Sequence, residues 1–405
     1  MLSTFPAIAA RESARVTDVW PSWPHFGEDE IEAVTAVLRS GRVNYWTGDE
    51  GRQFEAEFAA FVGCQHAIAL SNGTAALELA LRALQIGVGD EVITTSRTFI
   101  GTASSVIAVG ATPIFADIDA DSQNVFAASI RAVITPRTKA IIAVHLAGWP
   151  CDMDSILDLA REFGLRVIED CAQAHGATYK GRKVGSLGDV GAFSFCQDKI
   201  ITTAGEGGMV TTNDDVLWRW MWAYKDHGKS YSAVYETKHG PGYRWLHESF
   251  GTNWRLSEVQ SAVGRIALQR LPQWLAIRRQ HAARLGASLS EHMALRIPKS
   301  PLEISHAYYK FYAFVRPEQL LNGWTRDGIA EAITSHGVPC TTGSCSEVYL
   351  EKAFAVGLRP QNGLAISRQL GATSLMLQVH PTLEDRHIGH ACSVIAKVML
   401  DATAH

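Results

Sequence analysis

A polar turn, Ser-Asn-Gly-Thr at residues 71–74, stands where an apolar strand predicted over 66–70 meets a strongly helical segment over 75–84. Free backbone N–H groups and the positive end of the dipole at a helix N-terminus favour a bound phosphate. Gly73 would let an anion approach the backbone closely, and Thr74 would add a hydroxyl. The same residue types favour an ordinary helix cap, so this turn alone leaves both interpretations open.

Glu169 and Asp170 end another predicted strand, over 166–169. Ligands of α/β sheets bind beyond the carboxyl ends of the strands. A carboxylate at that position can hold a protonated ring nitrogen of a ligand. A cap of the turn that follows the strand is the structural alternative.

Lys199 follows the apolar stretch Gly-Ala-Phe-Ser-Phe at 191–195 and precedes the glycine-rich turn at 204–208. A lysine among apolar neighbours can act as an amine nucleophile on carbonyl groups. A solvated surface lysine is the alternative, which the apolar and glycine-rich flanks disfavour. The lysine is therefore a candidate for covalent catalysis.

These features together supply the parts that pyridoxal phosphate (PLP) needs. The turn at Gly73 and Thr74 would anchor the phosphate, Lys199 would form the Schiff base, and Asp170 would face the pyridine nitrogen. An ionised aspartate keeps that nitrogen protonated, which strengthens the ring as an electron sink. The order of turn, aspartate and lysine along the chain is also the order in PLP enzymes of fold type I.

The composition is that of a globular protein and excludes several classes. Of the 405 residues, 47% are hydrophobic and 19% are charged, which excludes wholesale disorder and collagen. The formal net charge is −4, so no nucleic-acid partner is expected. The sequence has neither the pattern of a signal peptide nor a long apolar span, so we expect a cytoplasmic protein without a membrane partner.

Other common site motifs are missing from the sequence. It has no GxGxxG after its first strand and no P-loop, which disfavours a classical dinucleotide site and a nucleoside-triphosphate site. The cysteines lack CxxC spacing, so we expect reduced thiols and no metal site. They are seven in number: Cys64, Cys151, Cys171, Cys196, Cys340, Cys345 and Cys392.

The elements that must position the candidate residues alternate between strand and helix. After helices over 28–40 and around 54–61, strands are predicted over 66–70, 91–95, 113–116, 140–144 and 166–169, with helices between them over 75–84, 100–109, 127–134 and 152–163. Such alternation predicts a largely parallel sheet covered by helices. Two further strands, 190–195 and 208–212, flank the loop that carries Lys199, and a helix is predicted over 214–224.

The second half of the chain predicts a smaller α+β domain. A long helix over 256–285, with a break expected at Pro272, would link a large domain (1–255) to a C-terminal domain that includes a strand over 309–315 and helices over 326–336 and 387–399; the linking helix and the small domain together make up 256–405. Residues 226–252 have no clear period, and we interpret them as a segment that covers the substrate.

Seven stretches, in order along nearly the whole chain, resemble the DegT/StrS-type PLP-dependent sugar aminotransferases. They are residues 54–59, 71–77, 98–99 with 110–119, 169–177, 188–199, 205–208 and 251–260. The resemblance implies a fold-type-I PLP transferase with a mostly parallel seven-stranded sheet covered by helices in the large domain and a smaller α+β C-terminal domain.

The resemblance also assigns residues to the cofactor ring. Lys199 would form the Schiff base and move the proton between the donor Cα and the cofactor, and Asp170 would pair with the pyridine nitrogen. Gln173 would contact the ring hydroxyl and Phe99 would stack on the ring. The structural alternatives are a turn cap for Gln173 and a core position for Phe99.

By the same resemblance, Gly73, Thr74 and Ser194 would hold the phosphate. Ser194 alternates with two phenylalanines, so the polar face of a strand is its alternative role. Asn253 would reach the phosphate in the neighbouring subunit, which implies a homodimer with shared active sites.

Three positions depart from the pattern of the family. Arg97 precedes Thr98 where an uncharged residue is usual, Trp149 follows His-Leu-Ala-Gly, and residues 342–349 replace a segment with His and Pro. Arg97 would face a phosphate or carboxylate of the substrate, or form an ordinary salt bridge. These differences concern the acceptor rather than the cofactor.

The sequence therefore predicts an aminotransferase that moves an amino group from L-glutamate or glutamine to a nucleotide-linked 4-keto-6-deoxy sugar by a ping-pong mechanism. The motif Thr-Thr-Ala-Gly-Glu-Gly-Gly at 202–208 favours amination at C4 over C3. An aminotransferase for an aminocyclitol or another cyclic ketone of natural-product biosynthesis is the alternative. Lys199 argues against a related sugar dehydratase, which has histidine there, and the Lys199–Asp170 pair argues against a regulator that only binds PLP.

Overall fold

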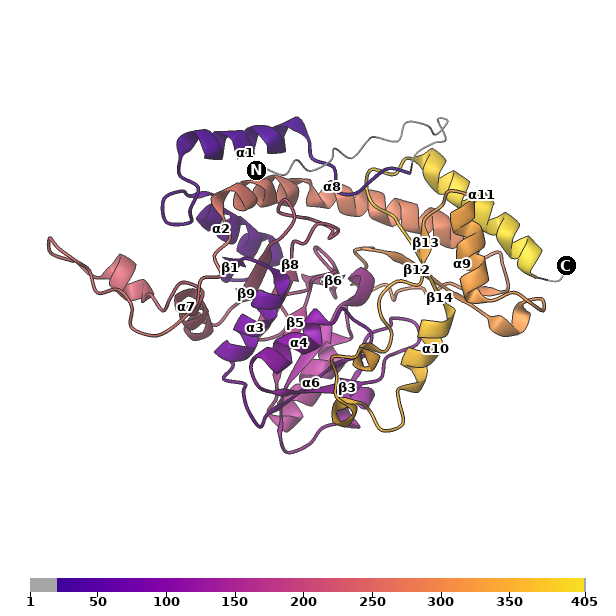
Figure 1. Ribbon diagram of the computed structural model, residues 1–405, viewed down its shortest axis with the longest axis horizontal. Helices are drawn as coiled ribbons and strands as arrows, with labels where there is room; N and C mark the ends of the chain where they lie inside the picture. Colours follow the sequence, from indigo (N-terminus) through magenta and orange to yellow (C-terminus); the bar gives the residue numbers. More distant parts are fainter. Residues whose placement is uncertain (1–19, 404–405) are drawn as a thin grey trace, which may run out of the picture.

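The strands of the central sheet are apolar on both faces, and this places helices on both sides of the sheet. In the computed structural model, which describes residues 20–403, alternate residues of one strand enter different cores: Ala140 and Ile142 pack on one face of the sheet, and Ile141 and Ala143 on the other. Helices cover both faces in Figure 1.

The strands of this structure are β1 (His66–Leu70), β2 (Glu91–Thr95), β3 (Thr112–Ala116), β4 (Thr138–Val144), β5 (Arg166–Asp170), β6 (Thr178–Tyr179), β7 (Arg182–Lys183), β8 (Val190–Ser194), β9 (Gly208–Thr212), β10 (Leu295–Arg296), β11 (Ile304–Ser305), β12 (Phe311–Val315), β13 (Cys340–Thr341) and β14 (Ser374–Leu377). The α-helices are α1 (Glu28–Ser40), α2 (Glu50–Val62), α3 (Gly73–Ala83), α4 (Gly101–Ala108), α5 (Ala127–Arg131), α6 (Met153–Phe163), α7 (Asp215–Tyr224), α8 (Glu258–Leu289), α9 (Arg326–Ser335), α10 (Ala365–Thr373) and α11 (Asp385–Ala402).

The central sheet has seven strands in the order β1-β9-β8-β5-β4-β2-β3. The strands from β8 to β3 are parallel, and β9 runs antiparallel to both of its neighbours. Helices α3, α4 and α7 pack on one face, and α2, α5, α6 and α8 pack on the other. This confirms the predicted sheet, and it brings the ends of β5 and β8 side by side.

The small domain has a second sheet, β10-β12-β14-β13, in which all neighbours are antiparallel. Its core takes Ile329 and Ile333 from α9 and Ile388 and Ile395 from α11. A small three-stranded sheet, β11-β6-β7, lies outside these two. The predicted domain boundary at residue 255 stays a prediction.

Helix α8 joins the two domains as one continuous helix of 32 residues (Figure 1). The break expected at Pro272 is wrong, since the helix runs through the proline. Leu271 and Leu275 are buried against the large domain and Leu285 against the small one, and these contacts stabilise the helix on both sides of the missing hydrogen bond.

Residues 226–252 form an arm that extends from the end of α7 away from the body of the molecule (Figure 1). The arm is irregular apart from one π-helical turn, Ser232–Glu236. Its aromatic side chains Tyr243, Trp245 and Phe250 are exposed. Across residues 20–403, no helix combines the length and apolar character that a bilayer crossing requires.

Candidate active site

The turn between β1 and α3 presents the start of a helix to a cavity. The Asn72 side chain caps α3 by accepting the N–H of Ala75 at 2.8 Å, while its carbonyl accepts the N–H of Ala76 at 3.2 Å. The N–H groups of Gly73 and Thr74 precede any intrahelical acceptor, and both residues line the cavity. These N–H groups are free to bind an anion, and the phosphate site stays a prediction.

Gly73 is required by the close approach of α3 to the end of β8. A Cβ atom at this position would lie 2.6 Å from the Cβ of Ser194 and 3.2 Å from its Cα. The glycine therefore lets the Ser194 hydroxyl and the start of α3 share one corner of the cavity. Strand β9 approaches the same turn as closely, since a Cβ at Gly208 would lie 2.3 Å from the carbonyl oxygen of Asn72.

Asp170 ends β5 as a buried carboxylate. It accepts the Thr102 hydroxyl at 2.8 Å and the N–H of Ala172 at 3.2 Å. Burial raises the pKa of Asp170, while these hydrogen bonds and the positive charge of Lys199 act in the opposite direction. Among the described residues no basic side chain forms an ion pair with it. A protonated ring nitrogen would supply the missing cation.

Lys199 lies on the loop between β8 and β9 and is half-buried. Its Nζ atom is 5.2 Å from the centre of the Tyr309 ring. The loop is held by the Lys199 carbonyl, which accepts the indole N–H of Trp23 at 2.8 Å, and by the Lys199 N–H, which bonds the carbonyl of Cys196 at 3.0 Å. These two backbone hydrogen bonds fix the loop from which the Lys199 side chain extends.

Phe99 and Gln173 complete the group that the sequence predicted. Phe99 is 69% exposed, so it is not the core residue that was its alternative, and its ring lines the cavity. The Gln173 carbonyl oxygen accepts the N–H of Ala147 at 2.8 Å, which assigns its amide nitrogen as a donor for a ligand.

These residues surround one cavity of about 1110 Å³ between the two domains. Gly73, Thr74, Phe99, Asp170, Gln173, Ser194 and Lys199 all line it. The small domain contributes Tyr312, Ser344, Cys345 and Met376. The unusual segment 342–349 therefore lies where an acceptor would be recognised.

Asn253 does not join this group. It is exposed and absent from the cavity lining, although its neighbour Trp254 lines the cavity. No residue of the arm 226–252 lines the cavity of its own chain, so the arm does not cover the site of the chain that carries it.

Arg97 does not face the cavity either. It is fully buried and donates to the Ser374 hydroxyl at 3.1 Å, with its guanidinium 5.4 Å from the centre of the Tyr312 ring. Burial lowers the pKa of Arg97. No salt bridge of Arg97 is formed within the described part of the chain, so the salt-bridge interpretation is wrong; its role toward a substrate stays a prediction, although the side chain does not line the cavity.

Several residues of the site were missed by the sequence analysis. Thr102, which donates to Asp170, lies one helical turn after Thr98, and their hydroxyls are 2.9 Å apart. The spacing Thr-x-x-x-Thr was the available signal. Tyr309 and Lys310 enter from the small domain, where no local pattern marks them.

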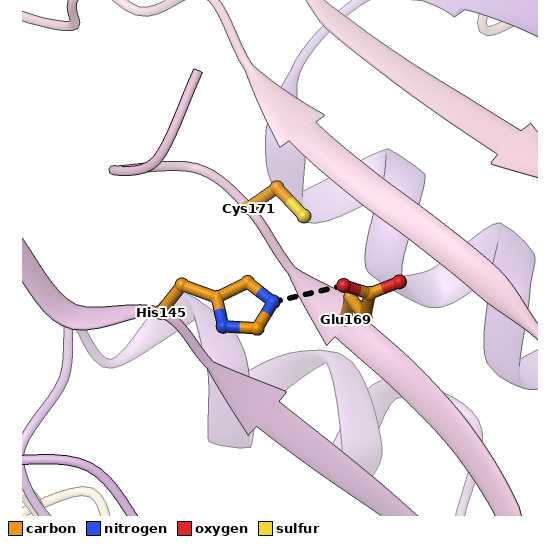
Figure 2. Close-up of side chains that lie close together, drawn as sticks. All are labelled: His145, Glu169 and Cys171. Atoms are coloured by element: carbon orange, nitrogen blue, oxygen red, sulfur yellow. Dashed lines mark hydrogen bonds and ion pairs between the residues drawn. The ribbon is translucent and has the colours of Figure 1, made fainter. Parts of the chain in front are cut away.

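His145, Glu169 and Cys171 form a buried cluster behind the cavity, shown in Figure 2. The His145 Nδ1 accepts the N–H of Cys151 at 3.0 Å, so its Nε2 carries the proton and donates to Glu169 at 3.0 Å. These contacts occupy the imidazole and leave it no free lone pair for a metal ion.

The Glu169 carboxylate is likewise fully engaged in hydrogen bonds. It accepts the N–H groups of Gly185, Leu187 and Gly188 at 2.7–2.9 Å. Burial alone would raise the pKa of Glu169, and the hydrogen bonds from His145 and the backbone hold it below its usual value. Because the backbone N–H of His145 also donates to the backbone carbonyl of Asp170 at 3.1 Å, the cluster supports the strand end that carries Asp170.

Comparison with known proteins gives one consistent result. Residues 24–396 match the DegT/DnrJ/EryC1/StrS aminotransferase family. The crystal structure of an aminotransferase from Psychrobacter cryohalolentis is 56% identical and covers 94% of this chain and 99% of its own, with a TM-score of 0.93.

Two curated relatives are also similar over most of their length. A UDP-N-acetyl-3-dehydro-alpha-D-glucosamine 3-aminotransferase of Acidithiobacillus ferrooxidans is 37% identical over 93% of this chain and 96% of its own. An L-glutamine:2-deoxy-scyllo-inosose aminotransferase of Streptoalloteichus tenebrarius is 39% identical over 79% of this chain and 76% of its own.

Proposed function

The chain belongs to the DegT/DnrJ/EryC1/StrS family and is an aminotransferase, and on this basis we propose that it uses PLP to move an amino group from L-glutamate or glutamine to a nucleotide-linked keto sugar. The acceptor we propose is a 4-keto-6-deoxy sugar, on the motif at 202–208. The meeting of Lys199, Asp170 and the start of α3 in one cavity is the observation that carries the proposal.

The described residues fit PLP in three independent ways. The start of α3 offers N–H groups and the Thr74 hydroxyl for a phosphate, and the end of β8 adds the Ser194 hydroxyl. Asp170 is a buried carboxylate without a cationic partner among the described residues, which suits a pyridinium nitrogen. The Lys199 amine lies at the same cavity as both.

When bound, PLP would accept the electron pair that stays on the donor Cα when this carbon loses its proton. Lys199 would carry that proton on Nζ between the donor Cα and the cofactor carbon, and would do the reverse for the acceptor. Asp170 would keep the ring nitrogen protonated. Phe99 would cover one face of the ring, and the Gln173 amide would donate to its hydroxyl.

Donor and acceptor use the same lysine, so they occupy the cavity in turn and the kinetics are ping-pong. A nucleotide-linked sugar is large, and a cavity of about 1110 Å³ has room for it beside the cofactor. The small-domain residues Ser344 and Cys345 are placed to contact the acceptor.

We also propose a homodimer in which Asn253 serves the partner's site. Asn253 is exposed and lies outside the cavity of its own chain. The base of the arm is fixed to the phosphate turn, because the Ser71 N–H bonds the Trp254 carbonyl at 2.9 Å. The exposed Tyr243, Trp245 and Phe250 would be covered by a second copy.

Mixing two inactive variants tests this arrangement. A dimer of Lys199→Ala with Asn253→Ala has one intact site if the two residues act in the same site from different chains. Activity should therefore return on mixing, and sedimentation should show a dimer. A fully active monomeric wild-type enzyme would contradict the proposed homodimer with shared sites.

An aminocyclitol aminotransferase is the second candidate, supported by the similarity to the scyllo-inosose enzyme. A panel of nucleotide-linked keto sugars and keto-cyclitols, with glutamate and glutamine as donors, separates the two. The ring carbon that receives nitrogen, C4 or C3, is read from the products.

An absorbance spectrum with and without L-glutamate tests the reaction itself. The wild type should be yellow and should bleach on donor addition, and Lys199→Ala should not complete this cycle. Lys180→Ala is the matched control, because Lys180 is an exposed lysine paired with Asp154. A wild type that binds no PLP, or that never responds to an amino donor, would contradict the proposed function.

A further inference from the structure

A second cavity of about 320 Å³ lies behind the Lys199 loop. Its walls come from residues 20–23, helix α8, the Lys199 loop and the residues that flank strands β12, β13 and β14 of the small domain. It shares Asp198, Tyr309 and Lys310 with the large cavity, and the Tyr309 ring is 5.2 Å from the Lys199 amine. The Tyr309 ring therefore separates this cavity from a small molecule that reacts at Lys199.

Arg278 of α8 lines the second cavity and is incompletely bonded. The side chain is 1% exposed, and its Nη1 donates to the carbonyls of Tyr308 and Tyr309 at 3.3 Å. Its Nε and Nη2 have no hydrogen-bond partner among the described residues. Burying donors of a charged group without partners is costly, so a ligand that accepts from them would be bound strongly.

The geometry of the two free donors selects the ligand. Nε–H and Nη2–H lie on the same edge of a guanidinium and point in parallel, which matches the two oxygens of a carboxylate. The Trp23 ring lies over the guanidinium, its centre 5.2 Å from Cζ, so a carboxylate could reach these donors only along the edge.

Lys310 adds a second positive charge to the same cavity. It is half-buried beside the Tyr309 ring, 4.7 Å from the ring centre, and no carboxylate lies within ion-pair distance of it in residues 20–403. The one acidic residue of the lining, Asp198, is exposed and accepts the Tyr309 hydroxyl.

The other groups that face Arg278 are neutral. Burial, together with the charges of Arg278 and Lys310, lowers the pKa of His380 to about 3, so this histidine is uncharged at neutral pH. Burial lowers the pKa of Arg278 to about 9, which leaves it protonated there. Burial also lowers the pKa of Lys310. With both side chains protonated, two cations face one carboxylate in this cavity.

We infer that this cavity binds a carboxylate group of the amino donor, with Arg278 and Lys310 as its partners. The inference rests on the proposed function for the identity of the donor. It adds what the large cavity lacks, since no arginine lines that cavity. The acceptor sugar has no carboxylate in the proposed reaction, and its nucleotide diphosphate is the competing anion, which the KM for the acceptor tests in the Arg278 variant.

Calorimetric titration of the PLP-loaded enzyme with glutarate tests the inference without turnover, because glutarate has two carboxylates and no amine. Arg278→Gln and Lys310→Gln should each weaken glutarate binding and raise the KM for L-glutamate about tenfold or more, the size expected for a lost charge-assisted hydrogen bond. In Arg278→Gln, the KM for the keto acceptor and the cofactor spectrum should stay as in the wild type.

Arg279→Gln is the matched control. Arg279 is the next residue of α8, donates to the His306 carbonyl at 3.0 Å and does not line the cavity. Its glutarate affinity should equal that of the wild type. If Arg278→Gln fails to fold because two backbone contacts are lost, Lys310→Gln still decides the question.

The donor panel assigns the carboxylate. A loss with glutamate but not with glutamine indicates the side-chain carboxylate, and a loss with both indicates the α-carboxylate. Unchanged glutarate affinity in both variants, or an equal loss in Arg279→Gln, would overturn the inference. If glutarate binds through Arg278 but no amino donor ever converts the cofactor, the proposed function fails and the donor assignment fails with it, while a carboxylate site remains.

Discussion

Asp170 is held as a carboxylate by a hydroxyl that the sequence analysis did not identify. Burial favours its protonated form, and the 2.8 Å hydrogen bond from Thr102 opposes this effect. A protonated Asp170 could not pair with a pyridinium nitrogen. The retention of the cofactor should therefore depend on Thr102.

Thr102→Val keeps the shape of the side chain and removes the donor. We expect the pKa of Asp170 to rise further, PLP affinity to fall about tenfold, and the acid limb of cofactor binding to move to higher pH. Equilibrium dialysis of PLP between pH 5 and 8 measures both effects.

Ser105→Ala is the control for this variant, because Ser105 lies on the same helix and bonds the Thr102 carbonyl rather than Asp170. It should bind PLP as the wild type does. An unchanged pH profile in Thr102→Val would show that the hydroxyl does not set the charge of Asp170.

At the scale of elements, the approach of α3 to β8 determines the phosphate corner. Gly73→Ala would place a methyl group 2.6 Å from the Ser194 Cβ, so α3 must move away from β8. We expect at least a tenfold loss of PLP affinity with a lower Tm. Gly87→Ala serves as control, since its nearest neighbour would be 3.7 Å away, and PLP titration with thermal melting compares the two.

Pro272 makes a second prediction about an element. Pro272→Ala restores an N–H in the middle of α8, so the free energy of unfolding should rise by about 1 to 3 kcal/mol with kcat unchanged. Chemical denaturation checks this against Gln273→Ala, an exposed neighbour. A drop in stability would mean that the helix is adapted to the proline.

Strands and helices with a strong local sequence pattern were predicted well, and elements that depend on distant contacts were not. Strands β1 to β5 and their helices have strong apolar periods and were predicted within a few residues. Pro272 was misjudged because contacts from two cores outweigh a local helix breaker. Lys199, on the loop between β8 and β9, was identified because it follows the phosphate turn and Asp170 in the order that PLP enzymes of fold type I show. Tyr309, Lys310 and Arg278 were not, since only the packing of the two domains brings them to that loop.

Over the whole molecule, buried histidines make stability depend on pH. Burial lowers the pKa values of His175, His306 and His380 to about 3. In the unfolded chain they titrate near 6.5, so between about pH 6.5 and 3 the unfolded state binds more protons. The stability that these neutral histidines contribute is complete above pH 6.5 and is lost as the pH falls.

Urea denaturation at pH 7 and pH 5.5 should show this loss, with up to about 1.4 kcal/mol per pH unit from each histidine. His175→Phe should reduce the dependence, because His175 lies between Phe193 and Phe195 and its ring nitrogens have no partner among the described residues. His336→Gln, at an exposed position, should leave it unchanged. Equal stability at both pH values would contradict the prediction.

The loop that carries Lys199 and the cavity beside it are completed by segments from opposite ends of the described chain, and this has a consequence for biosynthesis. Trp23 bonds the Lys199 loop, Trp20 bonds Gln378, and Met376 of β14 lines the cavity. A nascent chain cannot complete the site until β14 has left the ribosome. The residues of this cavity that would hold the cofactor all precede residue 200, so they can come together first, and the small-domain wall that would meet the acceptor is added only when synthesis is nearly finished.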